Sequence, residues 1–252
     1  MIVLETKQLT KIYRGKDESN STYALNGIDI KVNAGEFLGI MGPSGSGKTT
    51  LLNILGGIDK PSSGSIKIME KNIEGLGKNE LAIFRRKNLG FIFQDFNLMD
   101  SLTLEENVML PMVLDKKERY HMERNTKKIM KFFDIYNIKD KYPYNISGGQ
   151  QQRVATSRAL VNNPSIILAD EPTGNLDSKS SNNVMKYLYK LNKDIKSTIL
   201  MVTHDPFTAS FCNRIIFIKD GNIYMEITKK GNRKDFFNKI LDCQAIMGCS
   251  KS

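Results

Sequence analysis

The chain has 252 residues, 40% of them hydrophobic and 25% charged, a composition typical of a globular domain with its own core. Its formal net charge is +10, but the basic residues are scattered rather than striped, so we expect no nucleic-acid partner. The three cysteines lack metal-ligand spacing, and their odd number argues against a disulfide framework. Because no apolar run approaches the roughly 20 residues of a membrane span, and the last four residues lack the aliphatic positions of a prenylation box, we expect no membrane anchor in the chain itself.

The first expected elements are strands. Polar and apolar residues alternate around 3–5 and 28–32, which predicts antiparallel strands. Four later runs are apolar throughout and rich in β-branched residues, as in a parallel sheet that is covered on both faces: 37–40, 166–169, 199–202 and 215–218.

Helical patterns lie between and after these runs. Residues 94–160 have helical character, with one apolar face formed by Met122, Ile129, Met130 and Phe133. The chain turns basic after Lys229, and 236–247 have helical periodicity. We predict an α/β fold with a mostly parallel sheet, an N-terminal antiparallel β subdomain and an inserted α-helical subdomain at about 95–160. The main domain would cover residues 1–228, and a basic C-terminal tail 229–252.

Residues 42–49, with the sequence GPSGSGKT, match the phosphate-loop pattern G-x-x-x-x-G-K-[ST] in full, after an expected strand and before helix-compatible residues. Glycines allow backbone N–H groups to converge on phosphate oxygens, and the start of a helix favours anions. Lys48 would reach the β- and γ-phosphates, and the Thr49 hydroxyl would ligate Mg²⁺. The predicted phosphate-binding residues are Gly42, Ser44, Gly45, Ser46, Gly47, Lys48, Thr49 and Thr50.

The apolar run 166–169 is followed by two acids, Asp170 and Glu171. Ligands of open α/β sheets bind at the carboxyl ends of the strands, so this pair is expected near the phosphate loop. Asp170 is a candidate Mg²⁺ ligand, and Glu171 a candidate base for the water that attacks the γ-phosphate. Taken alone, the two acids are equally consistent with a solvated turn; the phosphate loop favours the catalytic interpretation.

A second helix start with an anion-binding pattern precedes this strand. Ser147 is a good N-cap, and Gln150 completes a capping box with it. Gly148 and Gly149 leave the backbone N–H groups of this helix start bare, which favours an anion there. A lone S-x-x-Q pattern would predict only an ordinary helix cap.

These motifs together resemble those of the ABC family of ATPases, with 146–150 as the signature motif and Ile146 where Leu is usual. The resemblance implies a P-loop NTPase (RecA-like) core that uses ATP and Mg²⁺. It also implies four further roles: adenine stacking by Tyr13, contact with Mg²⁺ and the attacking water by Gln94, a dimer-interface position for Asp177, and a γ-phosphate contact by His204. Taken singly, Tyr13 could be a strand aromatic, Gln94 a surface residue and His204 a helix cap.

The resemblance further implies two partners. A second copy of the chain would close each ATP with its own Ser147–Gln150 segment, and a separate membrane permease would hold the pair at the inner face of the cell membrane. We expect residues 95–108 to meet that permease, with Phe96 and Leu98 as exposed docking residues. The alternative is that these residues pack inside the helical subdomain.

Within the family, 95–100 and 172–178 resemble the branch of macrolide exporters, lipoprotein-releasing and cell-division ATPases. Residues 95–100 and 236–241 are most similar to ATPases of bacitracin- and lantibiotic-resistance transporters. Antimicrobial peptide resistance or export is therefore the expected function. The other members of that branch and the soluble iron–sulfur-assembly ATPases remain alternatives.

Overall fold

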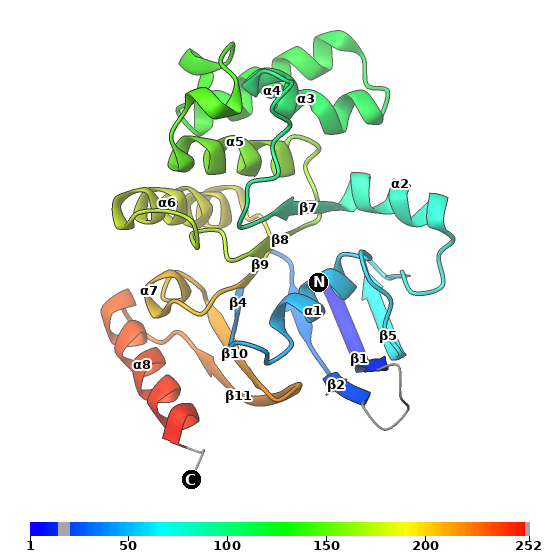
Figure 1. Cartoon of the computed structure of the whole chain (residues 1–252), viewed down its shortest axis with the longest axis vertical. Coiled ribbons are helices and arrows are strands. Elements are labelled where there is room, and N and C mark those ends of the chain that lie inside the picture. Colours follow the sequence, from blue (N-terminus) through cyan, green and yellow to red (C-terminus); the bar gives the residue numbers. More distant parts are fainter. Residues whose placement is uncertain (15–20, 250–252) are drawn as a thin grey trace.

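The computed structural model describes residues 1–14 and 21–249, so the last three residues of the predicted tail, which belong to the terminal tetrapeptide, lie outside the described part. Figure 1 shows a central sheet, an antiparallel sheet at its lower right, and a group of helices at the top. Within the described residues, none of the helices is long and apolar enough to cross a membrane.

The central sheet has six strands in the order β11-β10-β4-β9-β8-β7. All neighbours are parallel except β10 and β11. The predicted parallel sheet is confirmed, and the four apolar runs are its inner strands. The bounds are β4 Phe37–Met41, β7 Leu89–Ile92, β8 Ile166–Asp170, β9 Ile199–Val202, β10 Arg214–Lys219 and β11 Asn222–Thr228.

Both faces of this sheet are covered, which explains why its strands do not alternate with polar residues. Phe37 and Met41 of β4 belong to one buried cluster, whereas Leu38 and Ile40 of the same strand belong to another. The first cluster continues into the helices at the top of Figure 1, and the second continues into the antiparallel sheet. The carboxyl ends of β4, β8 and β9 are thereby fixed between two cores.

The antiparallel sheet confirms the predicted N-terminal β subdomain, but one predicted strand is wrong. The expected strand over 28–32 is interrupted, because the Thr6 hydroxyl donates to the Ile28 carbonyl at 2.8 Å and accepts from the Ile30 N–H at 2.8 Å. These bonds to the Thr6 side chain take the place of backbone ladder bonds, so the segment forms the ends of two short strands instead of one continuous strand. The strands are β1 Ile2–Arg14, β2 Ser21–Ile28, β3 Lys31–Asn33, β5 Ser63–Ile68 and β6 Lys71–Asn72.

The helices fall into three groups. α1 (Lys48–Leu55) follows β4, and α2 (Lys78–Asn88) precedes β7. The segment between β7 and β8 forms the helices at the top of Figure 1, within the predicted inserted region: α3 Leu104–Leu114, α4 Arg119–Phe132, the 3-10 turns η1 Tyr136–Ile138 and η2 Pro143–Asn145, and α5 Gly148–Leu160. The rest are α6 Ser178–Ile195, α7 Pro206–Ala209 and α8 Arg233–Cys249, the last longer than the helix predicted over 236–247.

Candidate functional site

The phosphate loop joins the end of β4 to the start of α1, as its sequence predicts. The Lys48 ammonium is folded into the loop, where it donates to the carbonyls of Gly42 at 2.9 Å and Pro43 at 2.7 Å. Burial lowers the pKa of Lys48, and the charges of Asp170 and Glu171 oppose that shift. Because an ammonium has three donors, one remains for an anion at the start of α1.

The glycines of the loop serve two different purposes. A Cβ on Gly42 would lie 2.1 Å from the Ile218 carbonyl oxygen, and one on Gly47 would lie 2.2 Å from the Ala24 carbonyl oxygen. Gly47 also has a φ of 100°, in the left-handed region. A Cβ on Gly45 would meet no atom within 4 Å. Crowding therefore requires glycine at positions 42 and 47, whereas the space around Gly45 is open.

We expect Gly47→Ala to lower the free energy of unfolding by about 3 kcal/mol or more, since it adds a steric clash to a left-handed backbone. Gly45→Ala should cost only about 1 kcal/mol, because its φ of 78° is unfavourable but its surroundings are open. Urea denaturation of both variants without nucleotide measures the difference. Equal losses would show that the clash with Ala24 is relieved at little cost.

The predicted magnesium residues come together in part. Thr49 Oγ1 lies 3.5 Å from Asp170 Oδ1. Burial and the neighbouring charge of Glu171 raise the pKa of Asp170, so a cation beside this carboxylate would stabilise its charged form. Among residues 1–14 and 21–249, no group of three His, Cys, Asp or Glu side chains is placed to hold a metal by itself. Two protein oxygens fit Mg²⁺, which takes its other ligands from water and phosphate.

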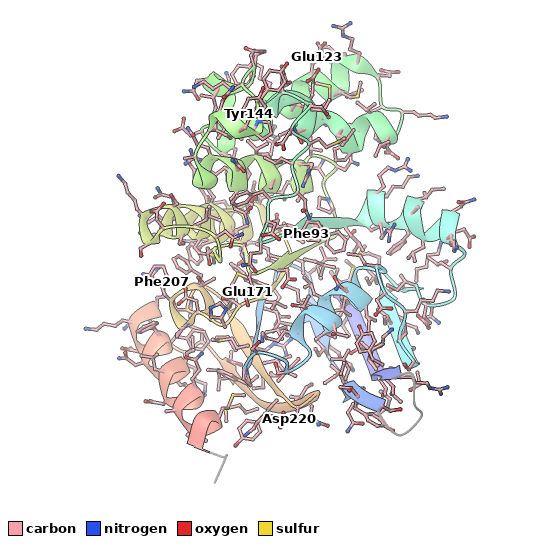
Figure 2. The ribbon with its side chains drawn as sticks, viewed as in Figure 1. Phe93, Glu123, Tyr144, Glu171, Phe207 and Asp220 are labelled. Atoms are coloured by element: carbon pink, nitrogen blue, oxygen red, sulfur yellow. The ribbon has the colours of Figure 1, made fainter. Side chains whose placement is uncertain are left out.

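Glu171 and His204 form the second part of the site. His204 Nδ1 lies 2.5 Å from Glu171 Oε2, beyond the ends of β9 and β8. Glu171 has a φ of 45°, a strained conformation for a residue with a side chain. Its N–H donates to the Val202 carbonyl at 3.0 Å and its carbonyl accepts from the Gly174 N–H at 2.9 Å, which fixes that conformation. Figure 2 shows Glu171 near the middle of the molecule, at the central sheet.

Gln94 is held by Asn175, which lies in the segment 172–178 that carries part of the family resemblance. Its side-chain amide donates to Asn175 Oδ1 at 3.1 Å, and Asn175 donates in turn to Asp95 Oδ1 at 2.8 Å. Of the three predicted magnesium residues, Thr49 and Asp170 therefore contact each other. Gln94 is instead bonded to the segment after Glu171. Because Asn175 meets Gln94 across 81 positions of sequence, no local pattern could have revealed this contact.

The predicted docking residues after Gln94 are only partly exposed, so the expectation that they are free is wrong for two of them. Leu98 is half-buried and packs against the main core, and Phe96 is half-buried, with its ring close to Gly148. The Arg158 guanidinium donates to the carbonyls of Phe96 and Asn97, at 2.9 and 2.5 Å, which fixes this turn. Met99, by contrast, is 47% exposed.

The second helix start has the predicted capping box. The Ser147 N–H donates to Gln150 Oε1 at 3.0 Å, and the Gln150 N–H donates to Ser147 Oγ at 3.4 Å. A Cβ on Gly149 would lie 2.7 Å from Ser180 Oγ, whereas one on Gly148 would have its nearest contact at an ordinary 3.4 Å. Figure 1 shows α5 well apart from α1, with β7 and β8 between them. One chain thus presents two separate helix starts that are candidate anion sites.

Asp177, predicted to lie at a dimer interface, is the N-cap of α6. Its carboxylate accepts from the N–H groups of Lys179 at 2.9 Å and Ser180 at 3.0 Å. Hydrogen bonds from the Ser180 side chain and backbone lower the pKa of Asp177. The residue therefore has a local structural role, whatever it contacts in an assembly.

Tyr13 is fixed by a small polar network at the end of β1. Its hydroxyl donates to Asp59 Oδ2 at 2.9 Å, and Lys11 Nζ donates to Asp59 Oδ1 at 2.7 Å. The same ammonium lies 4.8 Å from the centre of the Tyr13 ring. Partial burial works against ionisation of Asp59, but the bonds from Lys11 and Tyr13 hold its pKa below the usual value.

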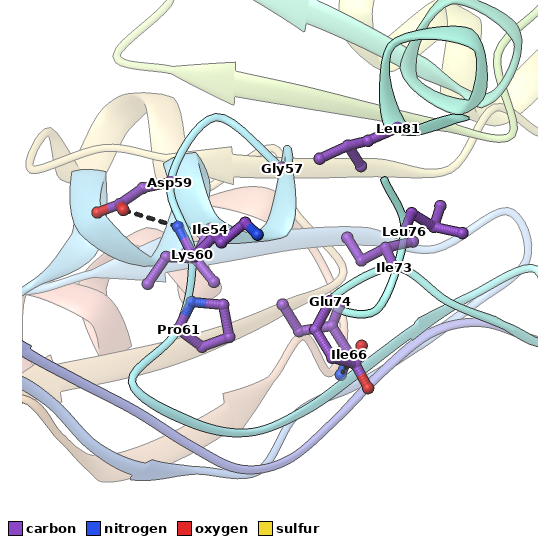
Figure 3. A pocket seen from close by; sticks show the side chains of 10 residues that line it. All are labelled: Ile54, Gly57, Asp59, Lys60, Pro61, Ile66, Ile73, Glu74, Leu76 and Leu81. Atoms are coloured by element: carbon purple, nitrogen blue, oxygen red, sulfur yellow. Dashed lines mark hydrogen bonds between the residues drawn. The ribbon is translucent and has the colours of Figure 1, made fainter. Parts of the chain in front are cut away.

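Tyr13 is 46% exposed, and Lys11 lies over its ring, so an adenine would stack on the free side. Figure 3 shows Asp59 beside a hollow, where it accepts from the Lys60 N–H at 2.7 Å. That hollow holds about 10 Å³, room for a single water at most, so it is no ligand site.

Comparison with known proteins provides independent findings. The family model described as "ABC transporter" matches residues 25–174. The chain is 51% identical to the bacitracin export ATP-binding protein BceA of Halalkalibacterium halodurans, over 98% of each chain. It is 51% identical to the uncharacterized ABC transporter ATP-binding protein YvcR of Bacillus subtilis, over 98% of this chain and 96% of that one. The dimeric post-hydrolysis structure of the ATP-binding cassette MJ0796 bound to ADP and Pi, a protein of Methanocaldococcus jannaschii, matches with a TM-score of 0.83 at 41% identity, over 91% of this chain and 100% of the other.

Proposed function

The chain belongs to the ABC transporter family, and on that premise we propose that it is the ATP-hydrolysing subunit of a transporter for antimicrobial peptides such as bacitracin. The full-length similarity to BceA supports the peptide assignment. The pairing of Glu171 with His204, beside Lys48 and Asp170, carries the proposal of hydrolysis. Residues 1–228 would form the ATPase domain, with 95–160 as its helical part and 229–252 as its tail.

The residues divide the work of hydrolysis between them. Lys48 and the N–H groups at the start of α1 bind the phosphates, and Tyr13 stacks on the adenine. Thr49 and Asp170 would hold Mg²⁺, which neutralises phosphate charge when bound. Glu171 accepts a proton from the attacking water, and His204 orients the Glu171 carboxylate and faces the γ-phosphate.

Two copies are needed to complete each site. The phosphate loop and the Ser147–Gln150 segment lie apart in one chain, so a nucleotide bound at the first cannot reach the second. In the assembly that we propose, the helix start at Ser147 closes the ATP held by the other copy. The dimeric structure of MJ0796 bound to ADP and Pi supports an assembly of two copies.

A separate membrane permease would bind the helical part of the chain, which places the ATPase at the inner face of the cell membrane. The surface that we propose for this contact is the loop at Met99. The buried Asn107 side chain fixes the loop, since it accepts from the Met99 N–H at 2.8 Å and donates to the Met99 carbonyl at 3.0 Å. The loop is therefore rigid, while the Met99 side chain stays exposed.

We expect Met99→Glu to weaken co-purification with the permease by at least about 10-fold, because it places a charge in an apolar contact. Ile223→Glu is the matched control; Ile223 is 37% exposed and belongs to β11, which lies at the opposite end of the molecule from α3 in Figure 1. Co-purification of the tagged chain with a co-expressed candidate permease measures the effect. Equal binding by both variants would rule out the Met99 loop as the docking surface.

A further inference from the structure

The C-terminal helix α8, which lies within the proposed tail 229–252, packs against the ATPase domain. One face of it is buried in the main core cluster, through Phe236, Ile240, Cys243 and Met247. These positions are spaced by three and four residues, as on one side of a helix. The same cluster contains Ile215 and Phe217 of β10, and Phe211, which follows α7. The helix therefore has a fixed position relative to the segment that carries His204.

α8 contacts that segment near both of its own ends. At its start, the Arg233 guanidinium lies 5.1 Å from the ring centre of Phe207 and 4.3 Å from that of Phe211. In its last turns, the Gln244 side-chain amide donates to the backbone carbonyl of His204 at 3.1 Å. Figure 2 shows Phe207 beside the upper end of α8. The helix thus spans α7 from one side to the other.

The His204 backbone needs such support, because the imidazole has little around it. The side chain is 68% exposed, and the contact that orients it is the one with Glu171. On its C-terminal side, the Asp205 N–H donates to Thr203 Oγ1 at 3.1 Å, and Asp205 caps α7 at the Phe207 N–H, 3.0 Å away. The carbonyl of His204 itself is held by Gln244 from outside this turn.

We propose that Gln244 is a positioning residue for hydrolysis: through the His204 carbonyl, α8 sets the place of the imidazole that meets Glu171. The inference rests on the proposed ATPase function and gives the C-terminal tail a role in the chemical step. Gln244 contacts neither the phosphate loop nor the network of Tyr13. Its loss should therefore change turnover and leave the affinity for ATP unchanged.

The test compares full-length Gln244→Met, which keeps the length and helix propensity of the side chain but removes the donor, with Asn238→Met, an exposed position of the same helix. Loss of one hydrogen bond at this point should lower kcat about 3- to 10-fold in Gln244→Met, with KM and the Kd for a fluorescent ATP analogue unchanged. Asn238→Met should match the unmodified chain. Gln244→Lys restores a donor on a flexible stem and should recover most of the loss.

Two outcomes would overturn the inference: an unchanged kcat in Gln244→Met, or an equal fall in Asn238→Met. If Gln244→Met instead lost ATP affinity and thermal stability together with kcat, without recovery in Gln244→Lys, Gln244 would have a merely structural role. That result would also overturn the inference. An unmodified chain without ATPase activity would instead contradict the proposed function.

Discussion

Glu171→Gln is expected to reduce ATP hydrolysis at least about 100-fold while ATP still binds. The amide has nearly the shape of the carboxylate and can still accept a hydrogen bond from His204, 2.5 Å away in the present structure. It cannot accept a proton from the attacking water. Lys48, Thr49 and Asp170 are unchanged, so the phosphates remain bound. Two copies closed around ATP should then persist, because the step that would separate them is blocked.

Phosphate release measures the turnover, and size-exclusion chromatography with ATP measures the dimer. Glu123→Gln is the matched control, since Glu123 is 52% exposed in an ion pair with Arg119 on α4, far from Glu171 in Figure 2. The control should hydrolyse ATP normally. Turnover by Glu171→Gln at the rate of the control, or a dimer that separates as fast, would exclude Glu171 as the base.

The central sheet could be predicted from sequence because its signals are local. Both faces of β4, β8 and β9 are buried, so each strand is a continuous apolar run. The capping box at Ser147 is equally local, since its two partners are three residues apart. The phosphate loop belongs to the same class, because its function requires a fixed spacing of glycine, lysine and threonine.

The remaining features depend on contacts between distant positions. The break between β2 and β3 is caused by Thr6, more than twenty residues earlier, and Asn175 meets Gln94 across the site. Likewise, Leu98 is apolar, as expected of a docking residue, but the packing of the helices leaves it half-buried against the core. A sequence pattern gives the polarity of such a residue, and only the tertiary structure decides which surface covers it.

Gly148→Asp should affect the fold and the function in opposite directions. Gly148 is the first residue of α5, and an acidic residue there stabilises a helix by about 0.3–1 kcal/mol. A Cβ at this position would have its nearest contact at 3.4 Å, from Leu176, so the chain accommodates a side chain. The same carboxylate would repel the γ-phosphate of an ATP held by the other copy. ATP hydrolysis should fall at least about 100-fold, while thermal stability is kept.

The binding of ATP to the single chain distinguishes the two-copy site from a one-chain site. Gly148→Asp should bind ATP through its own phosphate loop with unchanged affinity, yet in the Glu171→Gln background it should form no ATP-dependent dimer. Gly77→Asp, which adds the same charge at the exposed start of α2, should leave the dimer intact. If Gly148→Asp instead lost ATP affinity as a monomer, the Ser147–Gln150 segment would act on the nucleotide of its own chain. With unchanged ATP affinity and no dimer in Gly148→Asp, the helix start at Ser147 would be the element that closes the ATP of the other copy.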